Sequence, residues 1–168
     1  YILYNKPKDV DLNNLPNHLD LFLKDFYNEN NYFKLSLDHG FSGLVLFYDD
    51  INFNYELRKN NITVIYDIFL KNKLNDDQRK SLIDDIKNID QYSEVNFNEN
   101  NTIGIKTLIV FEELIFSELY NYNYSSIDRV LISNLDKFEV PRGKFKKLNN
   151  IEILNFKSLS TSPYKSSS

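Results

Sequence analysis

The residues best suited to chemistry surround a histidine in the first third of the chain. His39 stands between Asp38 and Gly40, and Ser36 and Ser42 flank it in the sequence. A loop histidine beside a carboxylate can act as a general base. Successive residues of an extended chain point to opposite faces, however, so Asp38 need not orient the imidazole of His39. We therefore interpret this segment as a solvated turn and assign no catalytic residue.

The composition of the chain limits other kinds of chemistry. Its 168 residues include no cysteine and two histidines, which excludes thiolate nucleophiles and leaves few ligands for a histidine-rich metal site. The 24 acidic and 20 basic residues give a net charge of −4, which provides no domain-wide basic surface. A single basic cluster at residues 142–147 is interpreted as a solvated connection. We expect no cofactor, no metal ion and no nucleic-acid partner.

Hydrophobic periodicity indicates the elements that would position these residues. Helical spacing predicts helices over 15–27, 75–89 and 112–120, and the second begins with the capping-box pair Asn75 and Gln78. Short apolar runs predict strands, at 33–37, 44–48, 62–68, 103–111, 129–133 and 151–155. Helices and strands therefore alternate in an α/β chain.

A repeated pattern occupies the second half of the chain. Residues 105–110, 127–132 and 148–153 each carry apolar side chains at the first, fourth and sixth positions, with offsets of 22 and 21 residues. Regular spacing of short strands is typical of solenoid proteins, in which each repeat lays its strand beside the previous one. The pattern predicts that Val110, Ile132 and Ile153 are buried on adjacent strands.

These copies resemble a leucine-rich repeat protein over about residues 103–160. The resemblance implies an α/β solenoid of short parallel strands with helices, whose exposed strand face binds another protein. The alternative is a non-repetitive mixed α+β domain with evenly spaced strands. A second resemblance, carried by Leu15, Pro16, Leu19, Leu23 and Phe26, is to the opening of an F-box, a helical docking motif that often precedes leucine-rich repeats.

The repeat register selects a candidate binding surface. Residues that alternate with the buried positions point outward, which predicts a binding strip without catalytic or metal-ligating residues. Its members are Ile109, Phe111, Arg129, Leu131, Ser133, Glu152 and Leu154. The function predicted from the sequence is a non-enzymatic protein-interaction module. The alternative from another class is a small toxin-type enzyme, such as a metal-independent nuclease, using His39 and a carboxylate.

The organisation of the chain is expected to be simple. Residues 1–160 are predicted to form a single α/β domain or a fragment of a longer solenoid, and residues 161–168 a polar, serine-rich tail. No apolar run approaches the ~18 residues of a membrane-spanning helix, and no signal peptide is visible. We therefore expect a cytoplasmic protein with no membrane partner.

Overall fold

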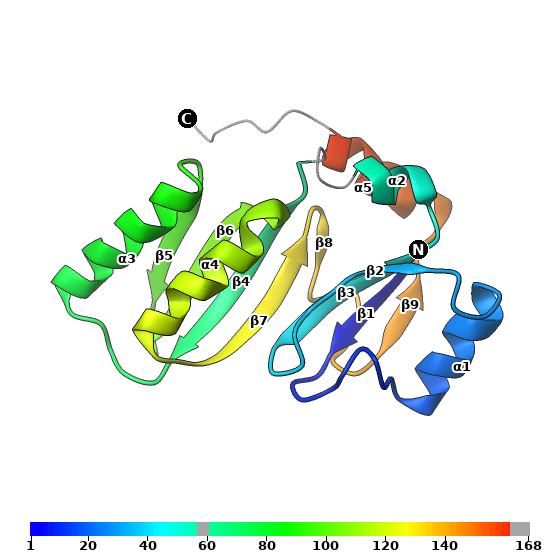
Figure 1. Ribbon diagram of the computed structural model, residues 1–168, viewed down its shortest axis with the longest axis horizontal. Helices are drawn as coiled ribbons and strands as arrows, with labels where there is room; N and C mark the ends of the chain where they lie inside the picture. Colours follow the sequence, from blue (N-terminus) through cyan, green and yellow to red (C-terminus); the bar gives the residue numbers. More distant parts are fainter. Residues whose placement is uncertain (57–60, 162–168) are drawn as a thin grey trace.

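A computed structural model describes residues 1–56 and 61–161, which form one sheet of nine strands with helices around it (Figure 1). The strands follow the order β5-β6-β4-β7-β3-β1-β9, with β2 paired to β3 and β8 paired to β7. Every pairing is antiparallel except that of β3 with β7. The sheet is therefore mixed and mostly antiparallel.

The elements have the following bounds. The strands are β1 (Ile2–Lys6), β2 (Phe33–Leu35), β3 (Ser42–Tyr48), β4 (Thr63–Leu70), β5 (Glu94–Asn98), β6 (Thr102–Leu108), β7 (Tyr124–Ile132), β8 (Leu135–Asp136) and β9 (Phe145–Lys147). The helices are α1 (Asn17–Phe26), α2 (Ile51–Glu56), α3 (Asp76–Ile89), α4 (Glu112–Leu119) and α5 (Asn150–Thr161), with short 3-10 helices η1 (Ile109–Phe111) and η2 (Tyr120–Tyr122).

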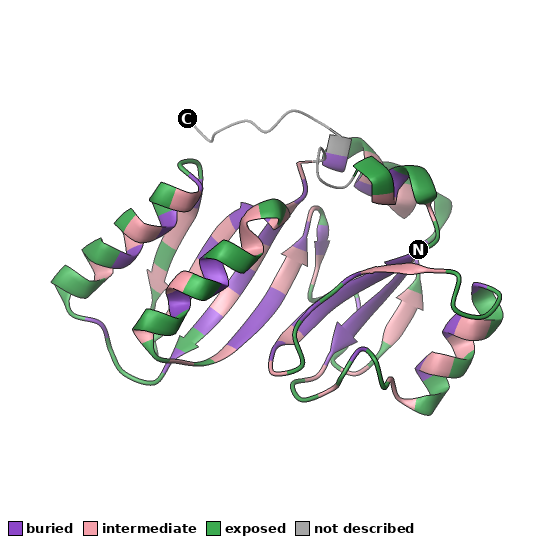
Figure 2. Ribbon diagram, in the orientation of Figure 1, coloured by how far each residue is buried: buried purple, intermediate pink, exposed green. Residues whose placement is uncertain are grey.

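One half of the sheet, formed by β5, β6, β4 and β7, is covered on one face by α3 and α4 (Figure 1). Buried and less buried residues alternate along β4, as Figure 2 shows, because a half-buried strand sends every second side chain into the core. The buried side chains Val64, Tyr66 and Ile68 belong to the same core as Leu82 of α3 and Ile115 of α4. This half is therefore built on one amphipathic sheet face.

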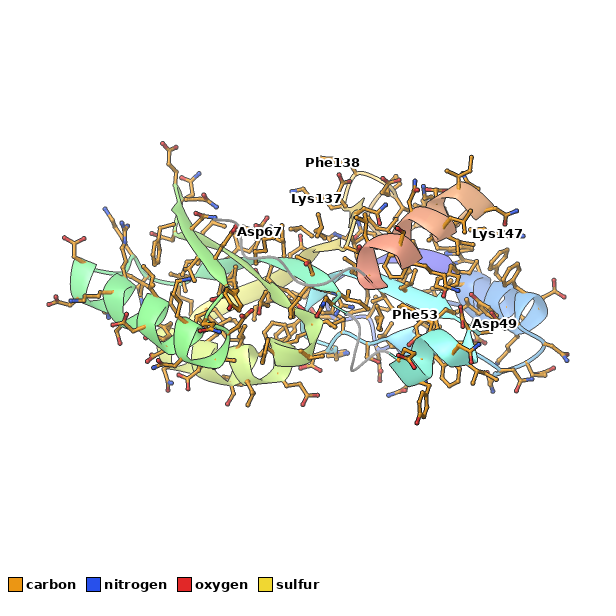
Figure 3. The ribbon with its side chains drawn as sticks, turned by 90° about the horizontal axis from the view of Figure 1, so that it is seen from above. Asp49, Phe53, Asp67, Lys137, Phe138 and Lys147 are labelled. Atoms are coloured by element: carbon orange, nitrogen blue, oxygen red, sulfur yellow. The ribbon has the colours of Figure 1, made fainter. Side chains whose placement is uncertain are left out.

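The opposite face of this half carries polar residues. In Figure 3 Asp67, Lys137 and Phe138 lie on the other side of the sheet from α3 and α4. Phe138 is 83% exposed, in the turn region after β8. Burial raises the pKa of Asp67, whereas the charge of Lys137 lowers it. The described residues contain no helix long and apolar enough to cross a membrane.

The other half, formed by β1, β2, β3 and β9, is buried more deeply. All five residues of β1 are buried, because β3 and β9 pair with its two edges and α1 packs beside it (Figure 1). Helices α2 and α5 lie together near the N-terminus, where the rings of Phe53 and Phe156 are 5.5 Å apart. Lys157 of α5 also binds Asp50 directly before α2, at 2.8 Å.

The two halves meet along one edge of β3, which β2 and β7 share. Strand β2 pairs with the end of β3, whereas β7 pairs in parallel with Ser42 and Gly43 at its start. Gly43 has a φ of +117°, and a Cβ atom at this position would collide with the backbone of Arg129. Glycine is therefore required for the close approach of β3 and β7. This junction determines where the candidate site forms.

The predicted leucine-rich repeats are wrong. The copy at 105–110 lies in β6 and η1, the copy at 127–132 in β7, and the copy at 148–153 extends into α5. Strands β6 and β7 are not neighbours, since both pair antiparallel with β4 between them. Val110 is 45% exposed, and Ile153 lies on a helix. Sequence spacing of about 22 residues therefore reflects antiparallel strands joined by helices, not stacked parallel repeats.

The F-box resemblance is also wrong. The chain passes from α1 to β2 after a short connection, and Leu19 and Leu23 of α1 are buried in the common core. The apolar spacing of this helix therefore reflects packing on a sheet. The predicted tail falls almost wholly on residues 162–168, outside the described residues, and its limited contribution to stability remains a prediction.

Candidate active site

A cleft opens where the two halves of the sheet meet. It has a volume of about 830 Å³, which is within the range of pockets that bind small ligands. One wall comes from β2 and the turn after it, including Ser36, Asp38 and Phe41. The other comes from η1, α4 and η2, including Glu112 and Phe116. The cleft therefore joins segments that are far apart in the sequence.

A fully buried arginine lies at the base of this cleft. Arg129 of β7 donates from Nε to the Leu44 carbonyl of β3, and from Nη2 to the Leu35 carbonyl of β2, both at 2.8 Å. Its Nη1 donates to both carboxylate oxygens of Glu112 at the start of α4, at 3.0 and 3.2 Å. One guanidinium thus ties β2, β3 and α4 to β7.

The electrostatics of the Arg129–Glu112 pair follow from burial. Burial raises the pKa of the Glu112 carboxyl, while the charge of Arg129 acts in the opposite direction. Burial alone would lower the pKa of Arg129, but Glu112 and Tyr66 together outweigh it and the pKa is raised. Both charges are removed from water, so loss of either one would leave the other buried without a countercharge. Such an unpaired charge strongly destabilises the folded state.

A buried tyrosine adjoins this pair. Tyr66 of β4 is fully buried, and burial raises the pKa of its hydroxyl well above the ordinary value, with Glu112 acting in the same direction. Tyr66 Oη has no hydrogen-bond partner that meets normal geometry among the described residues. Its ring lies 4.9 Å from that of Phe116, which faces the cleft. A neutral hydroxyl that interacts with both Glu112 and Arg129 therefore lies behind the aromatic wall of the cleft.

The cleft also contains a carboxylate that is not engaged elsewhere. Asp38 is exposed and lines the cleft, and its side chain makes no hydrogen bond or ion pair with another described residue. Its backbone is fixed, because the Asp38 carbonyl accepts a hydrogen bond from Phe41 N at 3.0 Å. The charge of Asp38 contributes to the raised pKa of Glu112. Asp38 is thus a free carboxylate held on an ordered turn.

A buried lysine holds this turn in place. Lys6 is fully buried, and its Nζ donates to the carbonyls of Val10, Pro7 and His39 at 2.9, 3.1 and 3.2 Å. The His39 carbonyl also accepts from Asp9 N at 3.0 Å. Burial lowers the pKa of Lys6 to about 8, although nearby carboxylates oppose the shift. Lys6 therefore links the segment after β1 to the turn that carries Asp38.

The low pKa of Lys6 predicts a pH-dependent stability. The folded chain loses the Lys6 proton near pH 8, whereas the unfolded chain retains it to about pH 10.4. The unfolded state therefore binds more protons between these values, and the free energy of unfolding rises with pH there. We expect the free energy of unfolding of the native protein, relative to Lys6→Met, to increase by about 1–2 kcal/mol between pH 7.5 and 9.5. Urea unfolding at both pH values measures it.

The comparison with Lys6→Met removes the effect of other groups. Tyrosines with raised pKa values are present in both proteins, so their contribution cancels in the difference. Lys144→Met, which changes an exposed lysine, is the matched control and should show no comparable pH dependence. If the difference in unfolding free energy between the native protein and Lys6→Met stays constant from pH 7.5 to 9.5, the Lys6 ammonium is not destabilised by burial.

The predicted binding strip is not formed. Its residues are divided among η1, β7 and α5: Ile109 and Phe111 lie in η1, Arg129 and Leu131 in β7, Ser133 just after β7, and Glu152 and Leu154 in α5. Arg129 is buried at the base of the cleft, and Ile109 lines it. Glu152 binds Lys146, and its carboxylate accepts a hydrogen bond from Asn149 N at the start of α5. A binding role for these residues remains a prediction, but they do not share one surface.

Sequence reasoning located the Asp38–His39 turn but missed the groups around it. The structure uses the carbonyl of His39, while the free carboxylate of Asp38 faces the cleft. Glu112 and Glu113 resemble the acidic residues that commonly begin a helix, so the sequence gives no sign that Glu112 pairs with Arg129. Among residues 1–56 and 61–161, no group of three or more acidic or histidine side chains converges as a metal site.

Comparison with known proteins identifies solved structures with a similar fold. No protein-family model and no curated protein matches the sequence. Solved structures do match, among them the crystal structure of a pseudouridylate synthase, with a TM-score of 0.66 over 92% of this chain and 72% of that one. The two sequences are 13% identical, so the likeness shows a shared fold.

This likeness corrects three sequence-based interpretations. The chain is a non-repetitive mixed α/β domain, which agrees with the alternative architecture and excludes the leucine-rich-repeat solenoid. The prediction of a leucine-rich-repeat interaction module is therefore wrong. The alternative of a toxin-type nuclease using His39 also finds no support in these comparisons.

Proposed function

We propose that this protein is an RNA-modifying enzyme that converts uridine to pseudouridine in the cleft between β2 and α4. The observation that carries the proposal is the free Asp38 carboxylate, which lines an 830 Å³ cleft on an ordered turn beside the buried Arg129–Glu112 pair. The similarity in fold to a pseudouridylate synthase supports the same reaction class.

The chemistry of the reaction accounts for the need for a carboxylate. Conversion of uridine to pseudouridine breaks the bond between C1′ and N1 and forms a bond between C1′ and C5, with loss of the C5 hydrogen as a proton and gain of a proton at N1. Positive charge develops at C1′ when a glycosidic bond breaks, and an adjacent carboxylate stabilises that charge. Asp38 is assigned this role because Glu112 is already bound by Arg129 through both oxygens.

The rest of the cleft is suited to a pyrimidine ring. Phe41 and Phe116 both line it, with ring centroids 4.9 Å apart in an edge-to-face arrangement. Aromatic side chains give an unpaired base an apolar surface on which to stack, as enzymes that act on single bases require. Arg129 holds the backbones of β2 and β3 beside α4, so its role is to keep the two walls at a fixed separation.

This proposal reverses one expectation from composition. A net charge of −4 argued against a nucleic-acid partner, because affinity for RNA depends strongly on phosphate contacts. An acidic protein can still bind RNA where a few cations lie along the strand, provided that the base is held in a cleft. The partner proposed here is therefore RNA in place of another protein.

The release of the C5 hydrogen gives a direct test. RNA transcribed in vitro with uridine tritiated at C5, covering ribosomal and transfer RNA sequences, is incubated with the protein. We expect tritium to appear in water, together with an equal amount of pseudouridine on chromatography of the digested RNA. Heat-denatured protein is the control. Absence of release from all these transcripts, with protein shown to be folded by circular dichroism, would overturn the proposal.

A further inference from the structure

A second, smaller cavity lies at the far end of the sheet half that α3 and α4 cover. It has a volume of about 400 Å³ and is formed by the turn between β5 and β6, the end of β4 and the start of α3. Its polar lining includes Lys73, Arg79 and several asparagines of the β5–β6 turn. We call this cavity the Arg79 pocket.

The arginine of this pocket is held in place without being neutralised. The Arg79 guanidinium lies over the ring of Phe97, 5.1 Å from its centroid. Arg79 Nε is buried and has no hydrogen-bond partner, and the side chain forms no ion pair with another described residue. A stacked guanidinium with unused donors is well placed to bind an anionic group such as a phosphate.

Aromatic residues connect the Arg79 pocket to the cleft. Tyr120 lines the cleft, and its ring lies 5.7 Å from that of Tyr124. Tyr124 pairs across the sheet with Leu70, which lines the Arg79 pocket. In Figure 1 these segments follow the lower edge of the molecule, from the end of α4 to the loop before α3. Segments that line the two cavities therefore meet along one edge of the sheet.

The charges along this edge are mixed. Lys71 and Lys73 are exposed in the loop between β4 and α3, and Lys73 lines the same pocket as Arg79. Glu99 lines the same pocket and Asp76 stands at the first turn of α3, so the edge is not a broad basic surface. An anion bound here would therefore depend on the geometry of Arg79 and Lys73 more than on a long-range field.

We propose that the Arg79 pocket is a second subsite for the RNA strand, binding a backbone phosphate and an unpaired base several nucleotides from the uridine in the cleft. This proposal rests on the proposed function. Arg79 and Lys73 bind the phosphate, and the strand follows Tyr120 and Tyr124, on whose rings unpaired bases stack. Asn100 and Asn101, both with positive φ in the β5–β6 turn, also line the pocket. The ligand is single-stranded because stacking requires exposed bases.

RNAs of two lengths distinguish binding at this subsite from binding in the cleft. Binding of fluorescein-labelled oligouridylates of 4 and 12 nucleotides is measured by fluorescence anisotropy for the native chain, Arg79→Met and Lys80→Met. Lys80→Met removes one exposed charge from the same helix at a position outside both cavities. Circular dichroism confirms that the three proteins are equally folded.

We expect Arg79→Met to weaken binding of the 12-mer about tenfold and to leave binding of the 4-mer unchanged. The slope of log K against log salt for the 12-mer should fall by about 0.7, the value for one lost phosphate contact on single-stranded RNA. Lys80→Met should change both affinities less than about twofold. Equal loss for both variants, or none for Arg79→Met, would overturn the subsite.

This experiment is independent of the isomerisation assay. If tritium is released but Arg79→Met binds the 12-mer as the native chain does, the subsite is wrong and the proposed function stands. If Arg79→Met selectively weakens the 12-mer while no tritium is released, the RNA site is supported and the proposed reaction is wrong.

Discussion

Replacing Asp38 by asparagine should lower the rate of tritium release from C5-labelled RNA by at least about 10³-fold. The substitution keeps the size of the side chain and removes the negative charge that stabilises C1′ as its bond to N1 breaks. Asp38 is exposed and makes no hydrogen bond or ion pair with another described residue, so the free energy of unfolding should change by less than about 0.5 kcal/mol. Single-turnover release and urea unfolding measure the two effects.

Glu113 provides the matched control for this prediction. It is exposed, lines the same cleft and lies in the first turn of α4, so Glu113→Gln removes one negative charge from the opposite wall. This variant should keep its rate within about fivefold of the native value if the charge is needed at Asp38 specifically. A rate within tenfold of native for Asp38→Asn, or an equal loss in Glu113→Gln, would show that Asp38 is not the reacting carboxylate.

Local signals in the sequence predicted some elements correctly. Asn75 and Gln78 form a complete capping box at the start of α3, with Gln78 N donating to Asn75 Oδ1 at 2.8 Å and Asn75 N donating to Gln78 Oε1 at 2.9 Å. The same arrangement starts α5, where Asn149 and Glu152 bond reciprocally at 2.8 and 3.0 Å. The apolar residues around it were interpreted as a strand at 151–155, because a short apolar run does not by itself distinguish strand from helix. Attention to Asn149 and Glu152 would have predicted the helix.

Other elements had weak local signals. No strand was predicted at the position of β5, since asparagine is uncommon in strands. Residues 99–101 connect the paired residues Asn98 and Thr102, however, and Asn100 and Asn101 both have the positive φ that tight hairpin turns require. Pairing with β6 therefore determines the conformation of β5 more than its intrinsic preference does. The apparent repeat failed for a related reason: a chain rich in isoleucine, leucine and asparagine produces similar spacings without a common structure.

The candidate site could be located only in part from the sequence. The turn at Asp38 and His39 was recognised as the best place for chemistry, but it was interpreted as a solvated turn, and only the alternative enzymatic function used His39. Lys6 and Arg129 lie 123 residues apart (129 minus 6) and have no shared motif, yet both hold the segments that border the cleft. Their function depends on the close approach of β3 and β7 at Gly43. Such an arrangement is a property of the tertiary fold and is not visible in local spacing.

Removal of Arg129 should have the largest effect on stability. Arg129→Met leaves the Glu112 carboxylate buried without its countercharge, and leaves the Leu44 and Leu35 carbonyls without their donor. We expect a loss of about 3–5 kcal/mol in the free energy of unfolding at pH 7, measured by urea. Lys24→Met is the matched control: Lys24 binds Asp20 at 2.8 Å but its side chain is 40% exposed, so its removal should cost only a small fraction of that loss.

Two further measurements attribute this loss to the unpaired charge. In Arg129→Met the pKa of Glu112 should rise further above its unfolded value, so that the lost stability is partly recovered as the pH falls from 7 to 5 and the carboxyl takes up a proton. The double variant Arg129→Met with Glu112→Leu removes both charges and should be more stable than Arg129→Met alone, because an uncompensated buried charge costs more than an apolar replacement of the pair. If the double variant is less stable than Arg129→Met, and the loss is independent of pH, then the role of Arg129 lies in its hydrogen bonds to β2 and β3 and not in its pairing with Glu112.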